Sequence, residues 1–361
     1  MTARAIRAAL GAAAFSAALG AQAPAAAPAV GHEGDYVATD FHFRSGEVLP
    51  KMTLHYTTFG APRRDAKGVV SNAVMILHGT TGSGKQFVSP QFAGVLYGPG
   101  QLLDTSRYYV ILPDGIGHGK SSKPSDGLRA HFPHYEYDDM VAAQHLLLVE
   151  GLKVDHLRLI LGTSMGCMHA WVWGETYPDF TDALMPLACN VVPIAGRNRV
   201  AREMAIEAIM QDPAWKGGDY TGPVPGMKTA IDMLMIMVSA PLYWQKQYPT
   251  RAAADSFYTN YVDARINAID PNDFLYAFQA SRNYDPSPNL ERVRVPVMHV
   301  NSADDFLNPP ELGLMEVMIK RVPRGKFVLL PVSDATRGHG THTLPAIWKP
   351  YLEELLKASQ P

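Results

Sequence analysis

The sequence has little excess charge of either sign. Its 361 residues include 32 lysines and arginines against 34 aspartates and glutamates, which gives a formal net charge of −2. It has no block rich in lysine or arginine, so its electrostatics give no reason to expect nucleic-acid binding. With 47% hydrophobic residues, the chain is long and apolar enough to bury one large core with an inserted subdomain. These properties are typical of an enzyme that acts on a small molecule.

Cysteine is scarce, and Cys167 and Cys189 are the only two in the sequence. Two cysteines do not make a disulfide framework, even in a compartment that oxidises thiols. We expect both to be small buried hydrophobic residues, and the sequence leaves their redox state open. The thirteen histidines are scattered, with no spacing typical of a metal site. We therefore expect neither a metal nor another cofactor.

Long hydrophobic runs are absent after the N-terminus, so we expect no membrane span in the mature chain. The N-terminus itself has the pattern of an export signal. Arg4 and Arg7 supply positive charge, residues 8–19 are apolar, and Ala21-Gln22-Ala23 resembles a cleavage site. We assign residues 1–30 to a signal peptide and linker, which predicts export to the periplasm or the extracellular medium. A disordered alanine-rich tail is the alternative.

The most informative motif is Gly162-Thr163-Ser164-Met165-Gly166. An apolar run typical of a buried strand precedes it, and a helical stretch that ends before Pro178 follows it. Strand, Gly-x-Ser-x-Gly and helix together form the nucleophile elbow of the α/β-hydrolase fold. The sharp turn needs glycine where side chains would collide, and it exposes the hydroxyl of Ser164 as a nucleophile. Alone, the motif could equally be a tight turn around a buried serine.

Two aspartates follow a later apolar segment, residues 295–300, in the chain order Ser, acid, His that this fold requires. Asp305 is the preferred acid because it stands four residues before Pro309, as in the corresponding loop of related hydrolases. Asp304 is the alternative. Either aspartate could instead cap the next helix, and we expect that role for the one outside the site.

Two histidines follow the strand expected at residues 326–331. His339 is the preferred general base because the last helix should begin a few residues after it. His342 is the alternative, and the histidine that is not used is expected to be a solvated loop residue. A third, His118, lies in a loop that is mainly structural in hydrolases, so we assign it no chemistry. A serine, an acid and a histidine in this order favour a catalytic set over a chance arrangement.

The backbone N–H groups of Thr80 and Met165 are the expected oxyanion hole. Met165 directly follows the proposed nucleophile, and Thr80 lies in a glycine-rich loop that begins at His78. This loop superficially resembles a phosphate-binding loop. However, Gln86 follows Lys85 where such a loop requires serine or threonine, and the glycines are misplaced. The sequence therefore gives no support for nucleotide binding.

These patterns divide the chain into a core that is interrupted once. Residues 31–190 alternate between strand and helix patterns, and residues 291–361 resume them. Over residues 191–290 the strand patterns stop and prolines break several helical stretches, which is typical of a helical lid. Within the lid, the apolar run at residues 233–238 predicts burial in the lid core or at a subunit contact. The expected fold is α/β: a mostly parallel central sheet, helices on both faces, and the inserted lid.

Over nearly its whole mature length the chain resembles the homoserine O-acetyltransferase family of α/β-hydrolase-fold enzymes. The most specific match is Asp212-Pro213-Ala214-Trp215-Lys216-Gly217-Gly218-Asp219-Tyr220, because it lies outside the general hydrolase signature. Ser164-Met165-Gly166-Cys167-Met168 matches as well. The resemblance implies that Ser164, Asp305 and His339 are the catalytic residues, with Thr80 and Met165 at the oxyanion hole. It also implies a homodimer formed through the lid.

The chain departs from this family where the family holds homoserine. The resemblance implies an aspartate directly after the catalytic histidine, where this sequence has Gly340. It also implies an arginine and a tyrosine on a lid helix, at the positions of Ile231 and Val238. The partners of the amino acid's ammonium and carboxylate groups are thus both missing, and an unpaired carboxylate in a dry pocket is costly.

The sequence therefore predicts a secreted serine esterase that hydrolyses short- or medium-chain, uncharged carboxylic esters through an acyl-enzyme on Ser164. The alternative is an O-acyltransferase that passes the acyl group to an alcohol. A third hypothesis is a non-catalytic binding protein on the same fold, and the complete Ser, Asp and His set argues against it.

Overall fold

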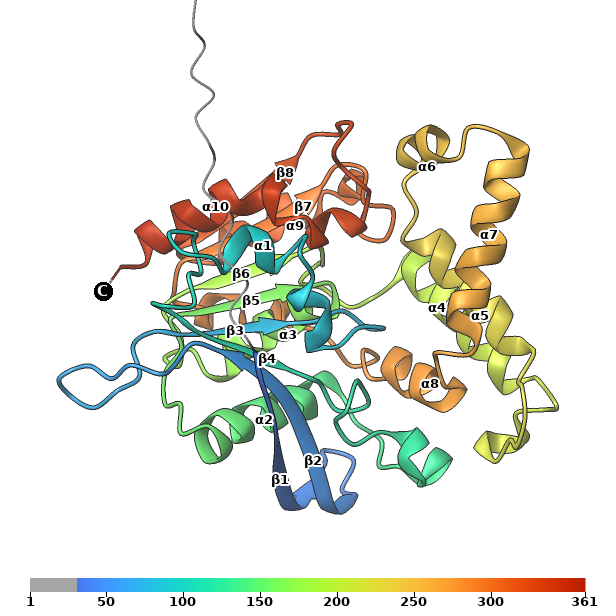
Figure 1. The fold of residues 1–361 in the computed structure, drawn as a ribbon, viewed down its shortest axis with the longest axis horizontal. Helices are drawn as coiled ribbons and strands as arrows, with labels where there is room; N and C mark the ends of the chain where they lie inside the picture. Colours follow the sequence, from blue (N-terminus) through green and yellow to red (C-terminus); the bar gives the residue numbers. More distant parts are fainter. Residues whose placement is uncertain (1–30, 361) are drawn as a thin grey trace, which may run out of the picture.

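An eight-stranded sheet forms the centre of the molecule (Figure 1). The computed structural model describes residues 31–360, and the expected signal peptide and linker lie outside this range. The strands are β1 (His32–His42), β2 (Val48–Phe59), β3 (Ala73–Leu77), β4 (Tyr109–Pro113), β5 (Leu159–Thr163), β6 (Leu184–Leu187), β7 (Val297–Ser302) and β8 (Gly325–Leu330). Their order across the sheet is β1-β2-β4-β3-β5-β6-β7-β8.

The sheet is mostly parallel. β2 pairs antiparallel with β1 and β4, and every other neighbouring pair is parallel. β3, β4, β5 and β6 are buried along their whole length. Continuous apolar strands of this kind suit a parallel sheet covered on both faces, because neither face meets water. The predicted fold class is confirmed.

Helices cover both faces of the sheet. The α-helices are α1 (Ala93–Leu96), α2 (Tyr137–Leu146), α3 (Met165–Thr176), α4 (Gly196–Met210), α5 (Gly226–Met237), α6 (Pro241–Gln247), α7 (Arg251–Ile266), α8 (Pro271–Gln279), α9 (Leu314–Met318) and α10 (Pro345–Ala358). Side chains of α2, α3 and α9 join the core on one face, and those of α1 and α10 join it on the other. A π-helical turn, Leu147–Gly151, directly continues α2.

Helices α4 to α8 form an insertion between β6 and β7, on the right of Figure 1. The insertion has a hydrophobic core of its own, in which α4, α5 and α8 contribute the largest share of buried side chains. The apolar run at residues 233–238 belongs to α5. Met235 and Met237 in this run are buried, whereas Ile236 is 51% exposed. The predicted burial of this apolar run is therefore found on one side of the helix only, and the side with Ile236 is exposed.

The four neighbouring strands β5, β6, β7 and β8 run parallel, so their carboxyl ends meet at one edge of the sheet. The loops that leave this edge are where ligands bind in open α/β sheets. The insertion also starts there, directly after β6. None of the helices in the described part of the chain is both long and apolar enough to cross a membrane.

Candidate active site

Ser164 lies on a strained turn between β5 and α3. Its backbone φ is 54° and its ψ is −111°, a combination that non-glycine residues rarely adopt. The two flanking glycines are required by space. A Cβ atom on Gly162 would lie 1.9 Å from the carbonyl oxygen of Gly166, and one on Gly166 would lie 2.2 Å from that of Leu77. The Gly-x-Ser-x-Gly spacing is thus the local cause of the turn that presents the hydroxyl.

Ser164, His339 and Asp305 form one continuous chain of hydrogen bonds. The Oγ of Ser164 lies 2.8 Å from Nε2 of His339. On the other side of the ring, Nδ1 lies 3.0 Å from Oδ2 of Asp305. Because a carboxylate only accepts, Nδ1–H donates to Asp305 and leaves Nε2 to accept the serine proton. The structure brings together the three residues that the sequence analysis preferred, from the loops after β5, β7 and β8.

Asp305 also fixes its own loop. Its Oδ1 accepts hydrogen bonds from the backbone N–H groups of Leu307 (2.8 Å) and Asn308 (3.1 Å). Burial alone would raise the pKa of this carboxyl, but His339 and the two backbone donors bring it below its usual value. Asp305 thus has both roles that the sequence analysis divided between the two aspartates: Oδ1 caps the backbone N–H groups of its loop, and Oδ2 contacts His339. The carboxylate stays ionised at neutral pH and is held in place.

The alternate aspartate, Asp304, faces a different set of partners. Its Oδ2 accepts from the Oγ1 of Thr336 (2.9 Å) and the backbone N–H of Gly338 (3.0 Å). Its Oδ1 lies against the hydroxyl of Ser302. Asp304 therefore ties β7 to the loop that carries His339, and it makes no hydrogen bond to the imidazole within the described residues.

The alternate histidine, His342, is half-buried, and its Nδ1 atom is inaccessible to solvent. It lies in a 3₁₀ turn, Gly340–Thr343, just before α10, with its ring centre 5.0 Å from that of His339. Burial, together with the charge of His339, lowers its pKa to about 3. His342 is thus a neutral packing partner of His339 and is only partly solvated, in contrast to the fully solvated loop residue expected.

The loop that carries Thr80 lies beside Ser164. A Cβ atom on Gly79 would be 3.4 Å from the Cβ of Ser164. Among residues 31–360, no hydrogen-bond acceptor is found for the backbone N–H of Thr80 or for that of Met165. Two unpaired backbone donors beside a nucleophile are the chemical requirement for stabilising an oxyanion.

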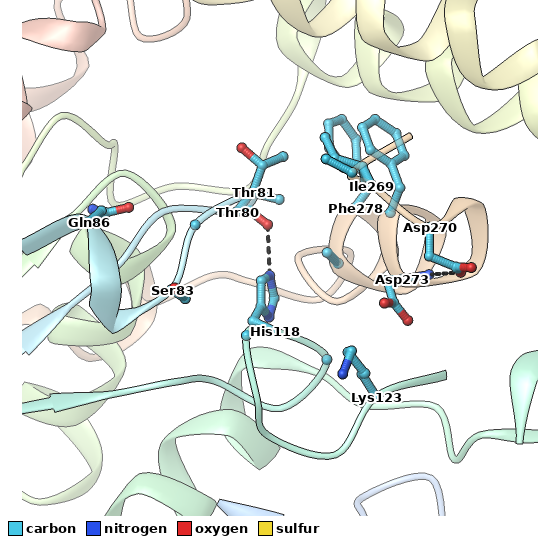
Figure 2. Close-up of a pocket in the computed structure, with 16 residues that line it drawn as sticks. Thr80, Thr81, Ser83, Gln86, His118, Lys123, Ile269, Asp270, Asp273 and Phe278 are labelled. Atoms are coloured by element: carbon cyan, nitrogen blue, oxygen red, sulfur yellow. Dashed lines mark hydrogen bonds between the residues drawn. The ribbon is translucent and has the colours of Figure 1, made fainter. Parts of the chain in front are cut away.

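The same loop is supported from below by His118, to which the sequence analysis assigned no chemistry. Its Nε2 lies 2.7 Å from the carbonyl oxygen of Thr80, the contact drawn as a dashed line in Figure 2. Burial lowers the pKa of His118, so the ring is neutral. Thr80 and His118 line a cavity of about 400 Å³. Asp270, Asp273 and neighbouring residues of the insertion form its opposite wall. His118 thus has a structural role in holding the loop.

A largely apolar cavity of about 610 Å³ opens at Ser164. It is bounded by α3, by the segment that joins β6 to α4, and by the loop after β7. Its lining residues are Ser164, Met168, Ala188, Cys189, Asn190, Val192, Pro193, Ile194, Ala195, Gly196, Arg197, Asn198, Arg202, Leu307, Asn308, Pro309, Leu312 and Leu314. The volume and the apolar walls suit a small organic ligand.

Known proteins share this architecture. A family model described as alpha/beta hydrolase fold matches residues 72–331. The homoserine O-acetyltransferase of Geobacter sulfurreducens is 32% identical over 311 residues, which cover 75% of this chain and 82% of that protein. The chain belongs to the homoserine O-acetyltransferase-like family of α/β-hydrolase-fold enzymes. The resemblance predicted from the sequence motifs is confirmed.

Two solved structures show the same fold. The homoserine O-acetyltransferase from Bacillus anthracis matches with a TM-score of 0.77 at 20% identity, over 91% of this chain and 98% of that one. An acetylester hydrolase from Corynebacterium glutamicum matches with a TM-score of 0.78 at 20% identity, over 91% and 96%. This α/β-hydrolase therefore has both acyltransferases and ester hydrolases among the proteins that share its fold.

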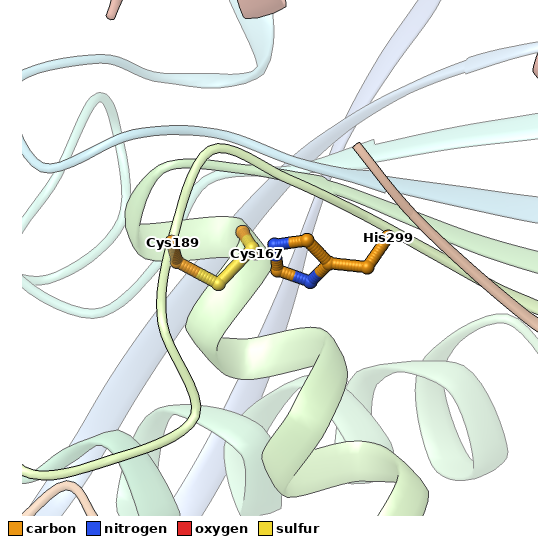
Figure 3. A group of neighbouring side chains, drawn as sticks. All are labelled: Cys167, Cys189 and His299. Carbon is orange, nitrogen blue, oxygen red and sulfur yellow. A yellow bond between two sulfur atoms is a disulfide. The ribbon is translucent and has the colours of Figure 1, made fainter. Parts of the chain in front are cut away.

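Cys167 and Cys189, whose redox state the sequence left open, form a disulfide in this hydrolase, with their Cα atoms 5.9 Å apart (Figure 3). Both residues are buried, as expected. Cys167 lies in the first turn of α3 and Cys189 just after β6. Because β5 and β6 are parallel neighbours, the start of α3 and the end of β6 are brought together. Sequence spacing could not reveal this contact, since it depends on strand order.

His299 on β7 lies beside the disulfide (Figure 3). Within residues 31–360, one group of three neighbouring side chains is of the types that bind metals: Cys167, Cys189 and His299. Both sulfur atoms are used in the disulfide, and the Nδ1 of His299 accepts a hydrogen bond from the Nε1 of Trp171 (3.3 Å). In the oxidised protein this group has a packing role and no free thiolate to offer a metal.

The three positions at which the family resemblance places homoserine ligands lie away from the 610 Å³ cavity. Gly340 follows His339, Ile231 is fully buried in the core of the insertion, and Val238 ends α5. None of them is among the residues that line the cavity.

A different charged residue, Arg202 on α4, does line this cavity, and the sequence analysis missed it. A signal was present, because Arg202 has helical spacing with Ala205, Ile206 and Ile209, which all face the core. An arginine on the buried face of an amphipathic helix needs a structural or functional partner.

Proposed function

We propose that this protein is a serine esterase that hydrolyses esters of short- or medium-chain carboxylic acids through an acyl-enzyme on Ser164. One observation carries the proposal: the hydrogen-bond chain from Ser164 through His339 to Asp305 opens into a largely apolar cavity. A polarised hydroxyl beside apolar walls fits an ester whose acyl chain is buried while its carbonyl meets the nucleophile.

In the acylation step, Nε2 of His339 takes the proton of Ser164 as Oγ attacks the carbonyl carbon of the ester. The negative charge moves to the carbonyl oxygen, where the N–H groups of Thr80 and Met165 can donate to it. Asp305 stabilises the imidazolium and keeps its orientation. When the carbon–oxygen bond breaks, His339 returns the proton to the leaving alcohol.

In the deacylation step, His339 deprotonates a water molecule, which attacks the acyl carbon. The same two N–H groups receive the second oxyanion, and the proton on His339 passes to Ser164 as the carboxylic acid leaves. The cycle needs no cofactor, because each proton and electron pair is returned within it.

Water is proposed as the acceptor because the homoserine ligands implied by the family resemblance are absent at Gly340, Ile231 and Val238. A zwitterionic acceptor in an apolar site needs partners for both charges, and no aspartate or glutamate lines the cavity to pair with its ammonium group. The second candidate function is O-acyl transfer to an alcohol. The 32% identity to the homoserine O-acetyltransferase of Geobacter sulfurreducens favours it.

We also propose that the protein is exported. Arg4, Arg7 and the apolar stretch after them support this, although residues 1–30 lie outside the described part of the chain. The Cys167–Cys189 disulfide supports it independently, because structural disulfides persist mainly in oxidising compartments. Expression in a bacterial host, fractionation and N-terminal sequencing test the proposal. Uncleaved protein confined to the cytoplasm would contradict it.

The decisive experiment for function follows the products of p-nitrophenyl acetate with and without L-homoserine by mass spectrometry. The esterase predicts acetate as the only acyl product, at a rate that homoserine leaves unchanged. Substantial O-acetylhomoserine would favour the transferase. Ser164→Ala should abolish turnover, while Ser71→Ala, a change at an exposed serine, serves as the matched control. Full activity of Ser164→Ala would refute the mechanism for both candidates.

A further inference from the structure

Arg202 is a buried cation without an acidic partner. Its side chain is on α4, and the residue is only 4% exposed. Two titratable groups act on it: Tyr137, a phenol that burial keeps neutral, and Arg199, a second cation. No ion pair among residues 31–360 includes Arg202. Burial lowers its pKa, yet a guanidinium remains protonated at neutral pH.

Neutral groups hold the guanidinium in a fixed orientation. Nε donates to Oδ1 of Asn198 (3.0 Å), and Nη1 donates to Oγ of Ser281 (3.2 Å). The ring of Phe278 lies under the guanidinium, with its centroid 5.1 Å from Cζ. Within residues 31–360, Nη2 makes no hydrogen bond. The arginine is therefore oriented like a binding group, with one nitrogen left to donate.

The cavity around Arg202 is positively charged and has no acidic side chain in its walls. Arg202 and Ser164 line the same 610 Å³ cavity, whose 18 lining residues include Arg197 but neither aspartate nor glutamate. Arg197 is exposed and packs over Phe306, 4.5 Å from its ring centroid. Two positive charges between apolar walls attract an anion, because the low local dielectric weakens screening. Without a bound anion, the buried charge of Arg202 lowers the stability of the fold.

We propose that Arg202 binds a carboxylate of the substrate, so that the ester cleaved at Ser164 carries a free carboxylate on one of its two halves. The inference rests on the proposed function, which places the ester carbonyl at Ser164. One free nitrogen and one buried positive charge match a singly charged carboxylate better than a phosphate dianion. The uncharged substrate expected from the sequence is thereby replaced by an acid ester.

The test uses two pairs of esters of similar size. Monoethyl adipate against ethyl heptanoate places the carboxylate on the acyl half, and 4-acetoxybutanoate against butyl acetate places it on the alcohol half. In at least one pair, kcat/KM should favour the anionic ester by about tenfold or more, which is the worth of one charged hydrogen bond. No preference in either pair would overturn the proposal.

Arg202→Met removes the charge and keeps much of the volume. It should lower kcat/KM for the preferred anionic ester about 10- to 100-fold, mainly through KM, and change the neutral ester less than about threefold. Arg251→Met, a change at an exposed arginine of the insertion that does not line the cavity, is the matched control and should change neither. Arg202→Lys should recover part of the preference. An equal loss for both esters of the pair would assign Arg202 a purely structural role.

Binding measured without turnover separates this proposal from the proposed function. The Ser164→Ala protein should bind the unreacted anionic ester by calorimetry, and the Ser164→Ala, Arg202→Met double variant should not. Inorganic phosphate is included as a competitor, and displacement of the ester by phosphate at equal concentration would contradict a carboxylate site. If Ser164→Ala binds the acid ester yet wild-type protein never cleaves it, the proposed function fails and the Arg202 site stands.

Discussion

The Nδ1 atom of His78 lies 2.8 Å from the carbonyl oxygen of Gly79, the next residue in the chain. Its Nε2 lies 3.0 Å from the backbone nitrogen of Gly115, which can only donate. Burial and the neighbouring His118 lower the pKa of His78 to about 3, so the ring is neutral with its proton on Nδ1. His78 therefore donates to Gly79 and fixes the planar peptide whose N–H belongs to Thr80.

Loss of this contact should reduce catalysis by freeing the Thr80 peptide to rotate. We expect His78→Ala to lower kcat for p-nitrophenyl acetate about 10- to 100-fold, below the cost of deleting an oxyanion donor outright, with little change in KM. His78→Asn keeps a donor near the position of Nδ1 and should retain more activity than alanine. Thermal unfolding of both variants provides the folding control. Equal kcat for wild type and His78→Ala would show that the peptide is held by other contacts.

The two adjacent aspartates should respond differently to amide substitution. Asp305→Asn keeps the size of the side chain but disturbs the tautomer of His339, and kcat should fall by about 10⁴, as in other Ser-His-Asp enzymes. Asp304→Asn weakens the contacts to Thr336 and Gly338, so it should cost about 1–3 kcal/mol of stability and leave kcat within about tenfold. Steady-state kinetics and urea unfolding of both variants check this. A reversed pattern would identify Asp304 as the acid that orients His339.

The Cys167–Cys189 disulfide closes a loop with a sequence separation of 22 residues. A cross-link of this span stabilises a fold by about 3 kcal/mol in the chain-entropy model. Reduction with dithiothreitol should therefore lower the Tm of the wild-type protein by several degrees. The Cys167→Ala, Cys189→Ala double variant should be less stable from the start and insensitive to the reductant. Thiol titration with no reducing agent should find both cysteines oxidised, and two free thiols there would contradict the disulfide.

Buried histidines should make the protein sensitive to mild acid. Burial lowers the pKa of His78, His299 and His342 from 6.5 to about 3 in the folded state. Between these values the unfolded chain binds protons that the folded chain does not, so the free energy of unfolding falls as pH falls. The expected slope is about 1.4 kcal/mol per pH unit for each histidine. Above the unfolded value the three residues should contribute no slope.

Urea unfolding at pH 7.5, 6 and 5 measures this effect. The free energy of unfolding should decrease steadily over the two lower pH values. His342→Gln removes one of these groups and should make the decrease shallower by about 1.4 kcal/mol per pH unit. A free energy that is the same at pH 7.5 and pH 5 would mean that these side chains are protonated within the fold.

Local patterns predicted those parts of the molecule that depend on local chemistry. The strand at Ala73–Leu77 follows from its sequence, because five consecutive apolar residues can be buried on both faces only within a covered sheet. The turn at Ser164 was predictable because two glycines are sterically required around it. The order Ser, acid, His narrowed the choice to two adjacent aspartates and two nearby histidines. The spacing of Asp305 from Pro309 and of His339 from the last helix then selected between them.

Contacts that depend on packing between distant elements could not be predicted from the sequence. The disulfide required knowledge that β5 and β6 are neighbours, and the partial burial of His342 depends on its packing against His339. The buried position of Arg202 depends on α4 packing against α8, through Ser281 and Phe278. Helical spacing was an unused signal that Arg202 lies on the inner face of its helix, but only the fold shows that no acid meets it there.

The hydrogen bond between Ser164 and His339 joins residues that are 175 positions apart, with the whole insertion between them. The entropy lost on closing a loop grows only with the logarithm of the loop's length. Adding or removing a helix in the insertion therefore changes the entropic cost of bringing Ser164 and His339 together only slightly. Strand pairing from β5 to β8, and not the intervening chain, sets the distance between the two atoms. The helices of the insertion can therefore be replaced as one unit, in evolution or by engineering. Such a replacement would change which ester is bound while the reacting atoms keep their geometry.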